Sequence, residues 1–186
     1  LSMEMGYLLK EKFEFGQNER FELIAYSIFL FAFALILGSV PGLPAQFFVG
    51  TVVNAVLVIS AFYLSGWKSV FPMILPSIAA YLSGIVFGAS SIFLLYFIPL
   101  IWLGNFVYVA LVKKFAVSEN QAGKGMLVAS AAKAALLFIC AIALVGLGIV
   151  PQMFLIAMGP MQFATAICGG AIGTWANILR KNRTFG

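Results

Sequence analysis

The feature that most constrains this chain is a series of apolar runs, each long enough to cross a lipid bilayer as a helix. A helix needs ~20 residues to cross ~30 Å of hydrocarbon at 1.5 Å per residue. Hydrophobic residues make up 63% of the chain and charged residues 9%, far from the composition of soluble domains. The runs lack the alternating polarity of barrel strands. We therefore expect an all-α membrane protein with six spans, at about residues 21–38, 47–64, 70–89, 91–112, 125–150 and 153–179.

Basic residues divide the predicted connections into two classes. The N-terminal tail, the second and fourth connections and the C-terminal tail hold ten of the eleven Lys and Arg residues, and the other connections hold none. Cytoplasmic loops carry the excess of Lys and Arg, so both termini of a multi-pass membrane protein should be cytoplasmic. The net charge of +5 is then a topology signal, and it does not predict nucleic-acid binding. The ten residues are Lys10, Lys12, Arg20, Lys68, Lys113, Lys114, Lys124, Arg180, Lys181 and Arg183.

This topology predicts the organisation of the chain. Residues 1–20 should form a cytoplasmic or interfacial segment, residues 21–180 a six-helix transmembrane domain and residues 181–186 a C-terminal tail. The first apolar run follows a segment of mixed charge and is long enough to span, so we expect a membrane helix there and no cleaved signal peptide.

The residue types that are missing argue against several functions. The chain has no histidine and no aspartate, and none of its six glutamates lies deep inside an apolar run. The usual general bases, metal ligands and proton relays are therefore lacking within the spans. Gly123-Lys124-Gly125 is not part of a P-loop pattern. We expect no enzyme, no catalytic or metal site and no cofactor, and we expect Cys140 and Cys168 to be packing residues in mid-span.

A few polar side chains recur at helical spacing inside the spans. Gln46 and Asn54 share a face of the second span with Gly50 between them, and a small-residue stripe on the last span predicts close helix packing. Each buried amide either bonds a neighbouring helix or contacts a ligand, and the sequence leaves both interpretations open. The other groups are Trp102, Asn105 and Tyr108 on the fourth span, and Gln162, Thr165, Ala166, Gly169, Gly170 and Gly173 on the last.

Lys133 is the one basic residue inside a span, about eight residues or ~12 Å from its inner end. A charged lysine facing lipid costs ~2.5 to 3.5 kcal/mol on insertion scales, so this side chain should face the interior of the bundle. No carboxylate of the spans can pair with it. Amides such as Asn105, water or an anionic ligand must then stabilise the charge. A lysine that snorkels or bonds an amide and a lysine that binds ligand both remain possible at this point.

Five stretches within residues 40–178 carry a family resemblance. They are VVNAVLV around Asn54, LPSIAAYLSG around Pro76, LGNFVYVALV around Asn105, AAKAALLF around Lys133 and PMQFATAICGG around Gln162. Together with six spans, cytoplasmic ends and no energy-coupling chemistry, they resemble the substrate-binding S components of energy-coupling factor (ECF) vitamin transporters. The chain is most similar to a less-characterised branch of these proteins.

The resemblance implies that the protein captures a small molecule from outside and delivers it by toppling in the membrane. A transmembrane coupling subunit and two cytoplasmic ATPases would drive that step. The cavity would open outward beneath the loop SVPGLPAQ, residues 39–46. The residues implied to bind substrate are Gln46 and Asn54 near the entrance, Tyr96, Trp102 and Gln162 deeper, and Asn105 and Lys133 lower still.

One departure from the family concerns the first span, AYSIFLFAFALILG. Family members have small-residue spacing there, where the coupling subunit docks, and this chain keeps only Ala34-x-x-x-Gly38. We therefore expect either docking through other surfaces or a protein that acts without the coupling module. Two further functions are compatible with the sequence: a small membrane scaffold or assembly protein without a ligand, and a stand-alone facilitator or channel.

Overall fold

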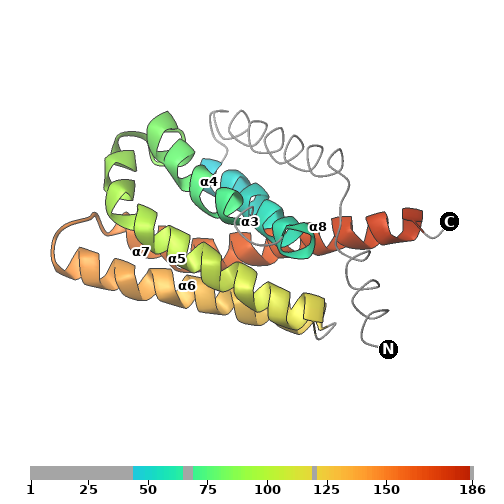
Figure 1. The fold of residues 1–186 in the computed structure, drawn as a ribbon. Helices are drawn as coiled ribbons and strands as arrows, with labels where there is room; N and C mark the ends of the chain where they lie inside the picture. The colour runs from blue at the N-terminus through green and yellow to red at the C-terminus, as the bar shows by residue number, and fades with distance from the viewer. Residues whose placement is uncertain (1–43, 65–68, 119–120, 185–186) are drawn as a thin grey trace.

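The computed structural model describes residues 44–64, 69–118 and 121–184, and every regular element in these ranges is a helix. The expected N-terminal segment, the first span, the first five residues of the expected capping loop and Trp67 lie outside the described residues. The longer elements are α3 (Ala45–Tyr63), α4 (Val70–Ser83), α5 (Leu94–Val112), α6 (Ala122–Gly146) and α8 (Pro160–Thr184) (Figure 1). The shorter ones are the 3₁₀ helix η2 (Gly88–Phe93), the π-helical turn η3 (Lys113–Ser118) and α7 (Met153–Met158).

Within the described ranges, four helical stretches are long and apolar enough to cross a membrane. They are Ala45–Tyr63, Gly88–Ala116, Ala122–Gly146 and Met153–Leu179, and each corresponds to one of the predicted spans. The chain therefore has the helices of a multi-pass membrane protein, as its apolar runs predict.

The third predicted span differs from a single helix over residues 70–89. Helix α4 has 14 residues, or ~21 Å of length, which is shorter than the hydrocarbon layer. It ends at Gly84, whose φ of 66° is the left-handed conformation that commonly terminates helices. A turn follows, and η2 then continues directly into α5. The apolar character of residues 84–89 was therefore misleading, because backbone conformation at one glycine ends the helix.

The last predicted span is divided at Gly159. Helix α7 ends at Met158, and α8 begins at Pro160, which has no N–H and suits the first position of a helix. Helix α8 continues to Thr184, beyond the predicted end at residue 179. The expected C-terminal tail therefore begins within this helix.

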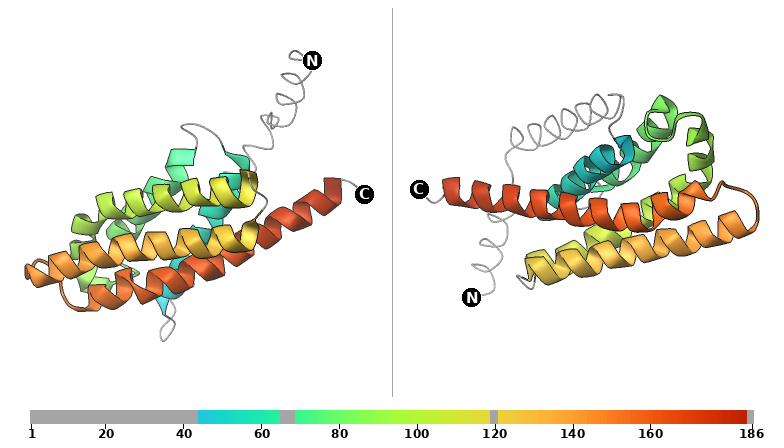
Figure 2. Two further views of the ribbon diagram at one scale, coloured as in Figure 1. Left: turned by 90° about the horizontal axis from the view of Figure 1, so that it is seen from below. Right: turned by 180° about the vertical axis from the view of Figure 1, so that it is seen from behind.

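Among the described helices, α3 and α8 form the most extensive contact, and α6 packs against both α5 and α8 (Figures 1 and 2). Glycines on α8 allow this approach. A Cβ atom at Gly169 would lie 2.7 Å from the Ala55 nitrogen, and one at Gly173 would lie 2.9 Å from the Ala55 oxygen. The predicted packing role of the small-residue stripe is confirmed at these two positions.

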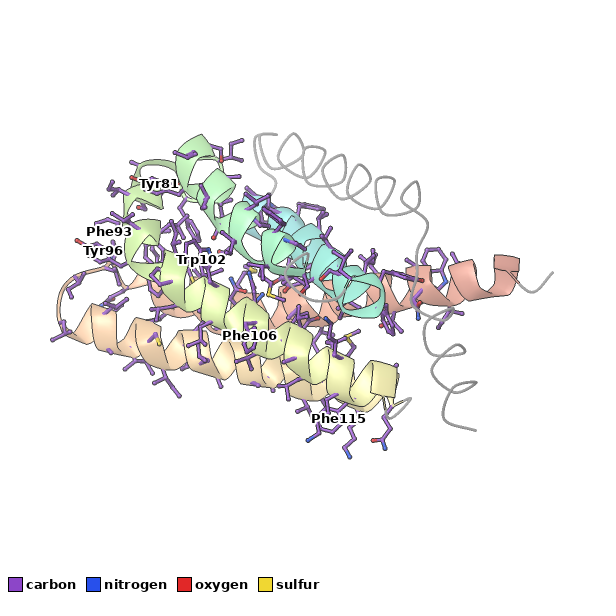
Figure 3. All side chains as sticks on the ribbon, in the orientation of Figure 1. Tyr81, Phe93, Tyr96, Trp102, Phe106 and Phe115 are labelled. Carbon is purple, nitrogen blue, oxygen red and sulfur yellow. The ribbon has the colours of Figure 1, made fainter. Side chains whose placement is uncertain are left out.

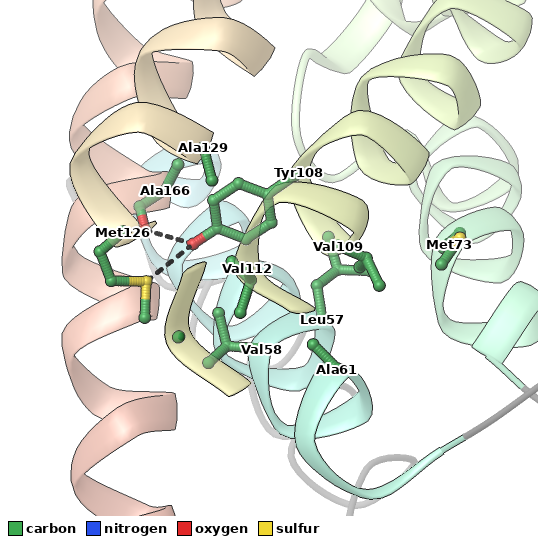
Figure 4. Close-up of a cluster of buried hydrophobic side chains, with 11 residues drawn as sticks. Leu57, Val58, Ala61, Met73, Tyr108, Val109, Val112, Met126, Ala129 and Ala166 are labelled. Atoms are coloured by element: carbon green, nitrogen blue, oxygen red, sulfur yellow. Dashed lines mark hydrogen bonds between the residues drawn. The ribbon is translucent and has the colours of Figure 1, made fainter. Parts of the chain in front are cut away.

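Within the described ranges, the core consists of two apolar clusters, with polar residues between them along α5 and α6. The first surrounds Tyr108, whose hydroxyl donates to the Ala166 oxygen at 2.8 Å (Figure 4). In the second, the rings of Phe97 and Phe154 stack with centres 5.1 Å apart. Along α6, Lys133 lies between residues of the first cluster, Met126 and Ala129, and residues of the second, Leu137 and Ala141. Along α5, Asn105 lies between Ile101, packed on the second cluster, and Tyr108 of the first.

Candidate functional site

A cavity of about 80 Å³ lies at this polar layer. A water molecule needs roughly 10–15 Å³ measured in this way, so the space corresponds to several waters. All the helices from α3 to α8 contribute to the wall, which includes apolar side chains such as Val53, Ile101 and Met158. The polar part of the lining is Gln46, Asn54, Ser77, Asn105, Lys133, Gln162 and Thr165.

Lys133 reaches this cavity from α6 and is 2% exposed. Its Nζ donates a hydrogen bond of 2.7 Å to Asn54 Oδ1 and lies 5.4 Å from the centre of the Tyr108 ring, within the range of a cation–π contact. The Lys133 side chain lies beside Gly104 on α5, where an added Cβ atom would be 3.5 Å from Lys133 Cγ, an ordinary van der Waals contact. The prediction that Lys133 faces the interior is confirmed, and the amide that accepts from it is Asn54 and not Asn105, the example that the sequence offered.

Asn54 is held so that its carbonyl oxygen faces the lysine. Its Nδ2 donates to the Gly50 oxygen at 2.9 Å and to Thr165 Oγ1 at 3.3 Å, and that hydroxyl donates to the Gln162 oxygen at 3.2 Å. This chain of bonds fixes the orientation of the amide.

The surroundings of the Lys133 ammonium are electrically neutral within the described ranges, which contain no aspartate or glutamate. An ammonium group carries three donors, and Asn54 is its one hydrogen-bond partner among the described residues. A buried charge that is stabilised by dipoles alone is not fully compensated for the loss of water. The site therefore has unused capacity to bind a negative charge.

Asn105 presents a second unused group. The residue is 1% exposed, and its Nδ2 donates to the Met73 oxygen on α4 at 2.8 Å. That carbonyl lies three residues before Pro76, where a proline ring loosens the helix bonding. Asn105 Oδ1 is buried and has no hydrogen-bond partner among the described residues. Leaving such an acceptor unpaired costs about 1–3 kcal/mol, so this oxygen can accept from a donor inside the cavity.

The structure places the seven predicted binding residues in two groups. Five of them, Gln46, Asn54, Asn105, Lys133 and Gln162, line the cavity. Gln46 also donates from Nε2 to the Ala157 oxygen at 2.8 Å, which joins the start of α3 to α7.

The other two predicted residues, Tyr96 and Trp102, are not among the residues that line the cavity. Tyr96 is 51% exposed and lies near the N-terminal end of α5 (Figure 3). Trp102 donates from Nε1 to Ser77 Oγ at 2.8 Å. It therefore acts on the cavity only through Ser77, which does line it.

Ser77 and Thr165 belong to the lining, and sequence reasoning did not include them among the binding residues. Thr165 follows Gln162 by three residues, so helical spacing already put it on the same face. Ser77 has a weaker signal, because it stands alone beside Pro76 in an apolar helix.

Fold and site together define a helical, multi-pass membrane protein with a partly polar cavity in its core. Comparisons of the chain with protein-family models, with curated proteins and with solved structures gave no match.

Proposed function

We propose that this chain is the S component of an ECF-type importer, the membrane-embedded subunit that captures a small vitamin-like or anionic organic molecule. One observation carries the proposal: the Lys133 ammonium forms part of a cavity wall inside the bundle, and its partners among the described residues are neutral. A carboxylate or similar anion in the cavity would form a charge-assisted hydrogen bond with Nζ, which is about twice as strong as a neutral one. Binding of an anion would therefore complete the site.

Transport by such a subunit depends on partners. The resemblance implies a transmembrane coupling subunit and two cytoplasmic ATPases in a prokaryotic plasma membrane, with both ends of this chain on the cytoplasmic side. The binding subunit itself performs no chemistry and needs no cofactor. The one small-residue pair of the first span, Ala34 and Gly38, lies outside the described residues. The surface through which this chain would dock on the coupling subunit is therefore part of the proposal.

A scaffold function is favoured by a different observation. The Lys133–Asn54 hydrogen bond joins α6 to α3, and the Asn105–Met73 bond joins α5 to α4. Polar bonds between membrane helices contribute about 0.6 kcal/mol on average, and a protein without ligand could use both to hold its helices together. The unpaired Asn105 Oδ1 and the cavity beside it have no role in that function.

Native mass spectrometry of the gently extracted protein tests the proposal. We expect the parent chain to retain a small organic molecule, because a high-affinity subunit carries its ligand through purification. Lys133→Met should lose that molecule, and the matched control Lys124→Met, at an exposed position in the first turn of α6, should keep it.

The same preparations separate the three functions. If the parent holds no small molecule and does not associate with a coupling subunit, the importer function is wrong. Disassembly or unfolding of both Lys133→Met and Gln162→Leu, without any ligand in the parent, would support a scaffold. Solute flux into liposomes that contain only this chain would support a facilitator.

A further inference from the structure

The cavity contains two unused binding groups of opposite kind, a cationic donor and a neutral acceptor. We propose that it selects ligands in which an anionic group, such as a carboxylate, adjoins an N–H or O–H donor. The anion would bind Lys133 Nζ, and the donor would be accepted by Asn105 Oδ1. This inference rests on the proposed function and specifies the class of its substrate.

The requirement that the ligand carry an N–H or O–H donor depends on the fixed orientation of the Asn105 amide. Asn105 Nδ2 donates a hydrogen bond of 2.8 Å to the Met73 oxygen. Rotating the amide by 180° would place Asn105 Oδ1 against that carbonyl, and two acceptors would then face each other without a proton between them. Oδ1 therefore keeps its position, and only a donor can satisfy it. A ligand with an ether or ester oxygen at this point would leave the acceptor unpaired.

The requirement that the ligand carry an anionic group depends on the position of the Lys133 ammonium. Its aliphatic chain passes Gly104, and Nζ is held between Asn54 Oδ1 and the face of the Tyr108 ring. These contacts position Nζ at the cavity wall. Inorganic anions without a proton, such as sulfate, would satisfy the charge equally well, but they would leave the neutral acceptor unpaired.

The two groups belong to the same small space. Lys133 and Asn105 both line the cavity of about 80 Å³, and a Cβ atom added at Gly104, the residue before Asn105 on α5, would lie 3.5 Å from Lys133 Cγ. A ligand that reaches both must carry its anionic group and its donor close together. Much of the remaining wall is apolar, with Val53, Leu94, Ile101 and Met158. The structure thus favours a compact acid with an apolar body and one N–H or O–H beside the carboxylate.

Three five-membered ring compounds test this inference on the purified full chain. Pyroglutamate has a ring N–H next to a carboxylate, 5-oxotetrahydrofuran-2-carboxylate replaces that N–H by an oxygen, and 2-pyrrolidinone keeps the N–H without the carboxylate. Binding is measured by isothermal titration and by the thermal shift of the protein. We expect pyroglutamate to bind about tenfold or more tightly than the lactone acid, since a site built around a buried acceptor rejects a ligand without the donor. Binding of 2-pyrrolidinone should be weaker still.

Two variants test the donor requirement and the anion requirement separately. Asn105→Leu should remove the difference between the lactam and the lactone acids, and Lys133→Met should weaken both acids. Asn177→Leu is the control for loss of a buried asparagine, because Asn177 is 6% exposed, accepts from Tyr63 and does not line the cavity. The comparison of the two acids on the parent chain needs no variant, so a folding defect in Asn105→Leu would not prevent the test.

Each other outcome would contradict a different part of the inference. Equal affinity for the two acids, lost in Lys133→Met, would exclude the donor requirement and leave the anion-binding function intact. A thermal shift with inorganic sulfate, which has no proton to donate, equal to that with pyroglutamate would indicate a site for inorganic anions. If none of the three compounds binds, the proposed ligand class is wrong. If native mass spectrometry also finds no bound molecule in the parent, the importer function fails with it.

Discussion

Lys133 Nζ lies 2.7 Å from Asn54 Oδ1, across 79 residues of sequence, and this bond connects α6 to α3 in the middle of the bundle. The two residues are unequal partners. Asn54 is neutral and has two other bonds, whereas Lys133 is charged and has Asn54 as its one hydrogen-bond partner among the described residues. Removing one or the other should therefore have different effects on stability.

Asn54→Leu should be strongly destabilising, by about 3–5 kcal/mol, because it leaves a buried charge without its partner. Lys133→Met removes the charge itself and leaves only the neutral Asn54 Oδ1 unpaired, so its effect should stay near 1 kcal/mol. The double variant should recover most of the stability that Asn54→Leu loses. Reversible unfolding of the purified protein in mixed detergent micelles measures all three free energies. Additive effects of the two substitutions would show that the bond is unimportant.

The inward position of Lys133 was predictable because the cost of a charge in lipid depends on the residue type and its depth alone. Its partner was not, because pairing depends on how α3 and α6 rotate about their axes. That rotation is set partly by α8, where Gly169 and Gly173 bring its backbone onto α3. That Gln46 and Asn54 share one face of a helix was predictable for the same reason as the spans. Spacing along one helix determines which residues share a face, whatever the positions of the other helices.

The failures have local causes. Gly84, with a φ of 66°, ends α4 within a run whose hydropathy alone suggests a continuous span, and Gly88, with a φ of 56°, begins η2. Tyr96 and Trp102 were implied to bind substrate by the family resemblance alone, and neither is among the residues that line the cavity. Asn105 was predicted as a polar residue of the bundle. Sequence alone could not predict that Asn105 Oδ1 is unpaired, because this depends on the position of the Met73 carbonyl, which accepts from Nδ2 and fixes the amide.

The contact of α8 with α3 predicts a second set of stability effects. Gly173→Ala should destabilise the protein by about 1–3 kcal/mol, because the new methyl group would lie 2.8 Å from Val58 Cβ and 2.9 Å from the Ala55 oxygen. Gly123→Ala is the matched control, since a Cβ there meets nothing within 4 Å. That change should be neutral or stabilise α6 by up to ~1 kcal/mol. Equal melting temperatures of the two variants would contradict the close packing.

Gln46 predicts a measurable effect at the break between α7 and α8. Its Nε2 bonds the Ala157 oxygen at 2.8 Å, two residues before Gly159. Gln46→Leu removes this tie, which is worth about 1 kcal/mol, so amide exchange in residues 153–160 should accelerate roughly fivefold. Gln152→Leu, at an exposed position next to α7, is the control and should leave exchange unchanged. Hydrogen–deuterium exchange with mass spectrometry measures both, and identical rates in the two variants would exclude a role for Gln46 in holding this segment.

The predicted orientation in the membrane has its own test at the two ends of α6. Lys124 lies in the first turn of this helix, and Leu147, which is 73% exposed, follows its last residue. On a background without Cys140 and Cys168, Lys124→Cys should react with a membrane-impermeant maleimide only after permeabilisation, because basic connections remain in the cytoplasm. Leu147→Cys should react on intact cells. The reverse pattern would invert the topology, and the cavity would then face a different compartment from the one that a capture subunit requires.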